Sequence, residues 1–176
     1  MVVAAVILPA GFHGDGLNDS KQVAPEVRER LYDDIRAEAV AWSIQVVPVE
    51  VIDELNILQA TFHGMRAALT ALSPAPDLAL IDGNPLPACP VRQQNIVGGD
   101  ARSASIAAAS ILAKVCRDLL MVELDAAYPG YGFARHKGYP TPEHFDALAR
   151  LGVCPAHRRS FAPVQACAQR TLAFDG

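Results

Sequence analysis

The segment that decides the fold reads LALIDGN at residues 78–84 and QNIVGGDARSASIAAASILAK at residues 94–114. A short apolar run that ends in Asp82, glycine and asparagine is typical of a buried β-strand followed by a turn. Two glycines precede Asp100, and a helix rich in small residues follows it. Ligands of open α/β sheets bind at the carboxyl ends of the strands. We therefore predict that Asp82 and Asp100 come together at one edge of a sheet.

Two converging aspartates predict a site for a hard divalent cation, because such cations prefer carboxylate oxygens as ligands. Each aspartate also fits a purely structural role. Asp82 suits the start of a turn, and Asp100 suits the N-cap of the following helix. The metal site is therefore inferred from the pair and not from either residue alone.

The composition predicts one folded domain over residues 1–176, with a helical C-terminal part at about residues 135–176. Of the 176 residues, 51% are hydrophobic and 19% are charged, which suits a folded core. No apolar run reaches the roughly 20 residues of a membrane helix. Residues 1–8, MVVAAVIL, lack the basic start and cleavage site of a signal peptide and predict a strand. The four cysteines have no CxxC spacing, which favours reduced thiols in a cytoplasmic protein.

The net charge of −4 argues against a nucleic-acid partner, but the charge is unevenly distributed. Residues 1–99 contain 6 basic and 12 acidic residues, whereas residues 100–176 contain 9 basic and 7 acidic residues. The basic residues of the second part cluster at residues 135–137 and 157–159. Such clusters contact phosphates in nucleic-acid-binding proteins, and they are also common on solvated faces.

Apolar periodicity and turn residues predict alternating strands and helices. Strands are expected at residues 2–8, 42–46, 78–82 and 94–97. Helices are expected from residue 25 to about 40, from 56 to 72, from 101 to about 127, from 141 to 152 and after residue 160, with an acidic turn at 50–54. This alternation indicates an α/β layer fold with a mixed sheet.

Eight segments of the chain together resemble bacterial ribonuclease HII, and they occur in that family's order along nearly the whole sequence. They are GLNDSK (16–21), NILQAT (56–61), IDGN (81–84), GDARSAS (99–105), AASILAKV (108–115), YGF (131–133), HKGYPT (136–141) and HRRSF (157–161).

The resemblance implies a ribonuclease H-like fold and an endonuclease that acts on the RNA strand of RNA–DNA hybrids and at single ribonucleotides embedded in duplex DNA. The family holds Mg²⁺ or Mn²⁺ with four carboxylates, of which Asp82 and Asp100 match two as catalytic metal ligands. Two such ions stabilise the charge that develops during phosphodiester hydrolysis, which leaves 5′-phosphate and 3′-hydroxyl ends. The resemblance further implies a protein that is monomeric when complete.

The expected nucleic-acid-binding residues are an aromatic side chain and a set of polar and basic ones. Tyr139 matches the family's tyrosine that stacks at the RNA–DNA junction, although without the resemblance a structural tyrosine is the better interpretation. Basic side chains position the duplex through its phosphates. The remaining expected contacts are Lys21, Ser103, Lys114, Arg158 and Arg159.

The chain departs from the family at its N-terminal end. The family's first strand, with an Asp-Glu-x-Gly-Arg-Gly motif that supplies the other two carboxylates, has no counterpart here. The only Asp-Glu pair, Asp53-Glu54, lies in another matched segment, and Gly98 replaces the family's usual lysine. The missing strand is central in the family's sheet, so its loss is expected to leave two unpaired strand edges.

Two origins of this departure are open: a start codon placed too late in the gene, which we favour, or a truncated chain. In either case we expect the polypeptide of residues 1–176 to be impaired as a nuclease. The alternatives are a non-catalytic protein that binds RNA–DNA hybrids on the same fold, and a structural partner that uses the exposed sheet edge.

Overall fold

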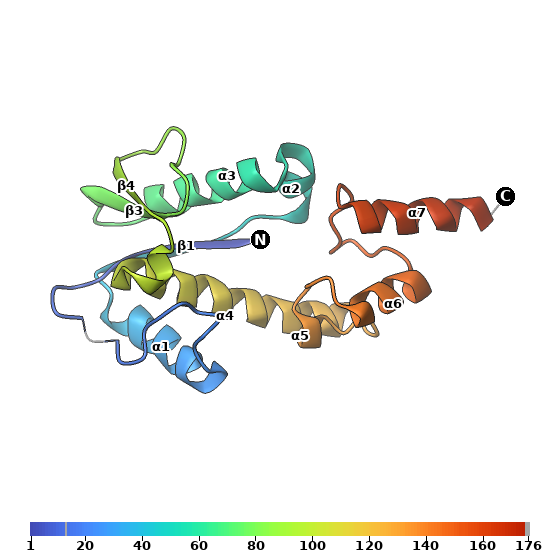
Figure 1. Ribbon diagram of the computed structural model, residues 1–176, viewed down its shortest axis with the longest axis horizontal. Helices are drawn as coiled ribbons and strands as arrows, with labels where there is room; N and C mark the ends of the chain where they lie inside the picture. Colours follow the sequence, from blue (N-terminus) through green and yellow to red (C-terminus); the bar gives the residue numbers. More distant parts are fainter. Residues whose placement is uncertain (13, 175–176) are drawn as a thin grey trace. The chain divides into compact units, whose positions relative to one another are not determined.

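The structure, a computed structural model, describes residues 1–12 and 14–174, with side chains up to residue 169. The chain forms two compact units (Figure 1). The first contains residues 1–47 and 58–116, and the second contains residues 48–57 and the chain from Arg117 onward. That residues 1–176 act as one domain, with a helical part at about 135–176, stays a prediction.

The first unit contains four strands and the helices that cover them. Its elements are β1 (Val2–Ile7), α1 (Pro25–Glu38), β2 (Ala41–Val46), α3 (Ile57–Thr70), β3 (Leu78–Asp82), β4 (Arg92–Ile96), the 3₁₀ turn η1 (Gly99–Ala101) and the first half of α4 (Ala104–Ala127). The second unit contains α2 (Val49–Leu55), the second half of α4, α5 (Phe133–His136), α6 (Pro142–Leu151) and α7 (Ala162–Phe174).

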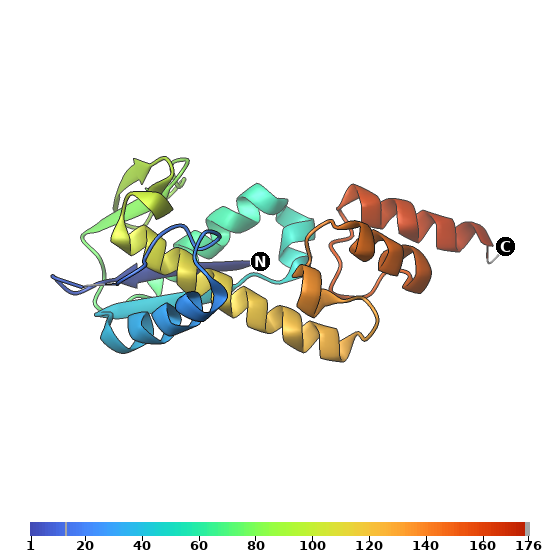
Figure 2. The same cartoon turned by 60° about the horizontal axis from the view of Figure 1, so that its bottom comes forward.

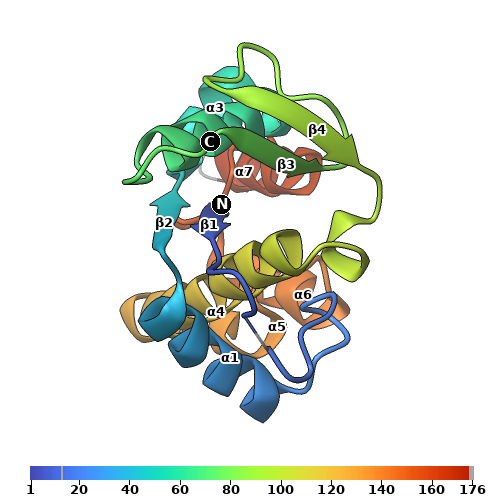
Figure 3. The same ribbon diagram turned by 90° about the vertical axis from the view of Figure 1, so that its left-hand side faces the viewer.

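The strands form two separate pairs within the described residues (Figure 3). Strand β1 pairs antiparallel with β2, so that Val2 lies opposite Val46. Strand β3 pairs in parallel with β4, so that Asp82 lies opposite Ile96. The α/β class with both strand directions is confirmed, and the strands are divided between two pairs. Since β1 and β3 each have a single partner, each keeps one unpaired edge.

A cavity of about 820 Å³ lies between the two strand pairs. All of residues 1–8 and 78–82 line it, so it follows β1 and β3 along their whole lengths. Its wall on α4 consists of Ser105, Ile106, Ala109, Ser110 and Ala113. These side chains are mostly small, and they let a backbone lie close to the helix.

The core of the first unit lies between α1 and α4, which run alongside each other in Figure 2. Leu31 and Ile35 of α1 are four residues apart, and both are almost fully buried. They belong to the same cluster as Ala108, Ile111 and Leu112 of α4. Helix α4 therefore has one large-residue face toward α1 and one small-residue face toward the cavity.

The second unit has its own aromatic core. Tyr131 and Phe133 stack with ring centroids 5.2 Å apart, and Ala147 of α6 and Cys154 are buried with them. Burial raises the pKa of the Cys154 thiol, so this sulfur stays protonated at neutral pH.

No helix in the described part of the chain is long and apolar enough to cross a membrane.

Helix α6 begins with a side-chain cap. The Thr141 hydroxyl accepts a hydrogen bond from the backbone N–H of His144 at 3.2 Å, and Pro142 occupies the first helical position. Replacing Thr141 by alanine is expected to lower the stability of the second unit by about 1 kcal/mol, since a helix N-cap contributes roughly that much. Urea unfolding measures the change. Thr141→Ser keeps a capping oxygen and should stay close to the original protein; an equal loss in both variants would contradict the cap.

Several local expectations were wrong. The acidic stretch at residues 50–54 lies in helix α2 and is not a turn. Pro48 precedes the helix, and the negative charge of Glu50 in the first turn interacts favourably with the helix dipole. Asn56 lies between α2 and α3 with φ of 68°, and its expected role as the cap of α3 stays a prediction. The expected helix from residue 101 is divided into η1 and α4, and the short helix α5 was not anticipated.

Candidate functional site

Asp82 ends β3 and is hydrogen-bonded to the turn that carries Asp100. Its Oδ1 accepts a hydrogen bond from the backbone N–H of Gly99 at 2.8 Å. A Cβ at Gly99 would collide with the Ile106 side chain and lie 3.3 Å from Asp82 Oδ1. Gly98 has φ of 63°, a left-handed conformation that favours glycine. The pair of glycines therefore permits the close approach of the two aspartate segments.

Asp100 lies within η1 and is partly buried. It lines a hollow of about 340 Å³ together with Asp15 and Ser103, whereas Asp82 lines the large cavity between the strand pairs. The two carboxylates thus line different hollows, and the hydrogen bond from Gly99 to Asp82 joins the two segments. The sequence analysis did not place Asp15 near Asp100. Its position in a glycine-containing loop at residues 14–16 was the only sequence feature that pointed to it.

The donor chemistry of this pair fits a hard divalent cation. The hydrogen bond from Gly99 uses Oδ1 of Asp82, and a carboxylate has a second oxygen with which to bind a cation. Mg²⁺ is commonly held by one or two carboxylates, with waters and substrate phosphates completing its shell. Among the residues that the structure describes, no group of three histidines, cysteines or acidic residues is arranged to hold a metal ion. Asp82 and Asp100 as metal ligands therefore stay a prediction, and a site built on them would have two carboxylates.

The other predicted site residues of the first unit have different settings. The Ser103 hydroxyl accepts a long 3.5 Å hydrogen bond from the backbone N–H of Ile106, so it caps α4. Lys114 is half-buried on α4. Lys21 is exposed, and its backbone N–H donates to Asp19 Oδ1 at 3.0 Å.

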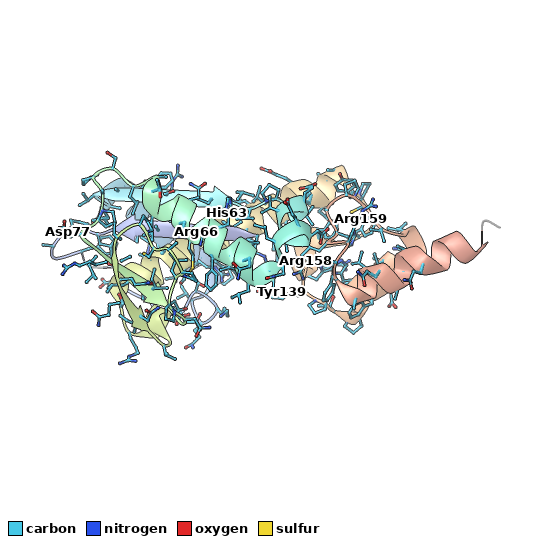
Figure 4. All side chains as sticks on the ribbon, turned by 90° about the horizontal axis from the view of Figure 1, so that it is seen from above. His63, Arg66, Asp77, Tyr139, Arg158 and Arg159 are labelled. Carbon is cyan, nitrogen blue, oxygen red and sulfur yellow. The ribbon has the colours of Figure 1, made fainter. Side chains whose placement is uncertain are left out.

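Tyr139 belongs to the second unit, and its side chain is labelled in Figure 4. It is 44% exposed, and the guanidinium of Arg117 lies 4.6 Å from the centre of its ring. Arg117 also donates to the carbonyl of Lys137 at 2.7 Å. The tyrosine is therefore a surface aromatic whose ring contacts a cation, so it is not part of the core, and its role in stacking stays a prediction.

Asp53 holds the backbone that carries Arg158 and Arg159. Its carboxylate accepts hydrogen bonds from the backbone N–H groups of Arg159 at 2.8 Å and Ser160 at 3.0 Å. Burial acts to raise the pKa of Asp53, but these bonds, the Ser160 hydroxyl and the Arg158 charge together lower it below its ordinary value. Arg159 is exposed, while the Arg158 guanidinium lies 5.0 Å from the Phe161 ring centre. The only Asp-Glu pair of the chain thus has a structural role.

Residues 1–164 match the ribonuclease HII family. The chain belongs to this family. It is 56% identical over 165 residues to the ribonuclease HII of Geobacillus kaustophilus, an alignment that covers 94% of this chain and 63% of that protein. The chain therefore spans less than two thirds of the length of this relative.

Two solved structures confirm the ribonuclease H-like fold. Ribonuclease H2 from Pyrococcus horikoshii superposes with a TM-score of 0.77 at 22% identity, over 97% of this chain and 98% of that one. Bst-RNase HIII, solved in complex with Mn²⁺, superposes with a TM-score of 0.72 at 21% identity, over 96% of this chain and 65% of that one. At these identities the likeness extends to the fold alone. The resemblance inferred from the eight sequence segments is confirmed by the family match.

Proposed function

We propose that this ribonuclease HII chain carries part of a metal-dependent endonuclease that cleaves the RNA strand of RNA–DNA hybrids and cuts at ribonucleotides embedded in duplex DNA. The observation that supports this most directly is the hydrogen bond from Gly99 to Asp82, which joins two acidic segments at the end of a strand. The Mn²⁺ complex of Bst-RNase HIII supports Mn²⁺ or Mg²⁺ as the cofactor.

In this proposal Asp82 and Asp100 would hold the cation. When bound there, the cation would supply a lowered pKa for a coordinated water and a positive charge opposite the phosphate. Gly99 fixes the orientation of the Asp82 carboxylate through its N–H. Tyr139 stacks on the nucleotide at the junction. Ser103, Lys21, Lys114, Arg158 and Arg159 contact the sugar–phosphate backbone, which sets the register of the duplex.

The cavity between β1 and β3 supports the proposal that the complete metal site includes one further strand. Neighbouring strands lie about 4.8 Å apart, so a strand between two unpaired edges can pair with both. The small residues of α4 leave room for such a backbone, and Asp82 lies at one end of the same cavity. A strand with two acidic residues near that end would raise the carboxylate number from two to the four that the family uses.

The polypeptide of residues 1–176 is expected to show little cleavage of a duplex with one embedded ribonucleotide in the presence of Mn²⁺. Fusing a segment with the Asp-Glu-x-Gly-Arg-Gly motif before Met1 should raise the rate by at least about a hundredfold, since removing one preorganised electrostatic contact costs ~10²–10³ in rate. The rate is measured by gel separation of the products.

The matched control is the same fusion with the acidic pair replaced by Asn-Gln, which should remain inactive. Robust Mn²⁺-dependent cleavage by the unfused chain would contradict the need for a further strand. A fused chain that binds the hybrid but shows no metal-stimulated cleavage would contradict the nuclease and favour a non-catalytic hybrid-binding protein.

A further inference from the structure

Helix α4 continues into the second unit, where Arg117 contacts the segment that carries Tyr139. Arg117 donates from Nη2 to the carbonyl oxygen of Lys137 at 2.7 Å. The carbon of its guanidinium lies 4.6 Å from the centre of the Tyr139 ring. Gly138 lies between these two residues, and a Cβ there would be 3.9 Å from the same Nη2 and 3.5 Å from Met121 Cε. One arginine, which the proposed function does not use, therefore contacts the residues on both sides of Gly138.

Two consecutive left-handed residues bend the backbone just before Tyr139. Lys137 has φ of 50° and caps the C-terminal end of α5, where its N–H donates to the Phe133 carbonyl at 2.9 Å. Gly138 follows with φ of 74°. A residue with a side chain, such as Lys137, keeps this conformation only where the surrounding structure holds it. Two hydrogen bonds to α4 contribute to this: Arg117 donates to the Lys137 carbonyl, and Lys137 Nζ donates to the Asp118 carbonyl at 3.3 Å.

The guanidinium of Arg117 also covers part of the Tyr139 ring. A cation over an aromatic face is attracted by the negative potential of the π-system. The Tyr139 side chain is still 44% exposed. A nucleotide base that stacks on this ring must therefore use the face that Arg117 leaves uncovered.

We propose that Arg117 is a positioning residue for Tyr139, which it holds in one orientation so that a single ring face meets the nucleotide at the RNA–DNA junction. This inference rests on the proposed role of Tyr139 in binding the hybrid. A ring that is ordered before the nucleotide arrives loses less side-chain entropy on binding. The entropy of one such side chain is equivalent to a roughly two- to tenfold change in Kd.

Arginine suits this role because its guanidinium is flat and its N–H donors lie in the plane. One N–H reaches the Lys137 carbonyl while the group as a whole lies over the Tyr139 ring. Lysine has the same charge, but its ammonium group is compact and has no flat face. The Arg117→Lys variant therefore keeps the charge but cannot make both contacts at once.

The first test measures the Tyr139 ring in the free chain of residues 1–176. The ring ¹H and ¹³C resonances of Tyr139 should shift in Arg117→Lys, because the group over the ring changes. The matched control is Arg66→Lys, which should leave these resonances unchanged. Arg66, labelled in Figure 4, lies on α3 and also donates to a backbone carbonyl, that of Pro87 at 3.1 Å.

The second test is a double-mutant cycle on the Kd for a labelled duplex that contains an RNA–DNA junction. Tyr139→Ala should raise the Kd at least about fivefold, because stacking of a base on an aromatic side chain contributes that much or more. Arg117→Lys should raise the Kd roughly fivefold when Tyr139 is present and less than about 1.5-fold in the Tyr139→Ala chain. Tyr139→Phe keeps the ring, so it should restore the full effect of Arg117→Lys. Arg66→Lys should leave the Kd unchanged.

Arg117→Gln is the second variant and serves the same cycle if Arg117→Lys does not fold. Its amide can still donate to the Lys137 carbonyl, but it has no positive charge to place over the ring. Its effect on the Kd should depend on the Tyr139 ring in the same way.

An effect of Arg117 on the Kd that is equally large without the Tyr139 ring would overturn the inference, because Arg117 would then contact the phosphates itself. Tyr139 resonances that stay unchanged in both Arg117 variants would overturn it as well. If Tyr139→Ala leaves the Kd unchanged while the ring resonances follow Arg117→Lys, Arg117 orients the ring as inferred, and the proposed stacking on the nucleotide fails.

Discussion

Replacing Ile111 by alanine is expected to lower the free energy of unfolding of the first unit by about 2–5 kcal/mol, the usual cost of truncating a large buried aliphatic side chain. Ile111 is fully buried in α4, within the cluster that contains Leu31 and Ile35 of α1. The neighbouring side chains of α1 and α4 are attached to hydrogen-bonded helices, so they cannot move far enough to fill the cavity that the substitution leaves. Urea unfolding followed by circular dichroism measures the loss.

The matched control is Leu119→Ala, which truncates a 54% exposed side chain on the same helix. It should change the stability by less than about 0.5 kcal/mol, as is usual for exposed positions. Equal effects of the two variants would contradict a core between α1 and α4. Because η1 leads directly into α4, the Ile111 variant should also weaken the metal site, whereas Leu119→Ala should not.

The sequence was most informative where local chemistry decides the structure. Strand β3 has the predicted bounds, since an apolar run that ends in aspartate and glycine leaves few alternatives. Helix α6 begins after Thr141 and ends before Gly152 as predicted, because threonine and proline define its start and glycine its end. The hydrogen bond between Asp82 and Gly99 fits the two glycines before Asp100, because a side chain at Gly99 would collide with Ile106.

Features that depend on distant partners were not predictable in this way. The separation of the strands into two pairs was expected only through the family resemblance, which implied a missing central strand, because local propensity does not report it. The His144–His157 contact joins residues from α6 and the loop that follows it. The hydrogen bond from the Ser160 backbone N–H to Asp53 joins residues that are 107 positions apart in the sequence.

Replacing Asp82 or Asp100 by asparagine is expected to reduce the affinity for Mn²⁺ by at least about tenfold, because the loss of groups that only orient a metal ligand already costs ~10–100-fold. Asparagine has nearly the same shape as aspartate, and its amide oxygen can still accept the Gly99 hydrogen bond. The Asp82→Asn variant should therefore keep the fold of η1 while the site loses a negative charge. Water-proton relaxation during a Mn²⁺ titration measures the affinity without requiring cleavage.

Asp77→Asn is the matched control for this prediction. Asp77, labelled in Figure 4, is exposed. It directly precedes β3, whereas Asp82 is the last residue of that strand. The same loss of one negative charge there should leave the Mn²⁺ affinity nearly unchanged, since solvent and salt screen charges that are more than about 10 Å apart. If all three variants weakened Mn²⁺ binding equally, the effect would come from net charge, and Asp82 and Asp100 would not form a common site. If Asp82→Asn alone lost affinity, the cation would be bound in the cavity between the strand pairs, and Asp100 would act only as part of η1.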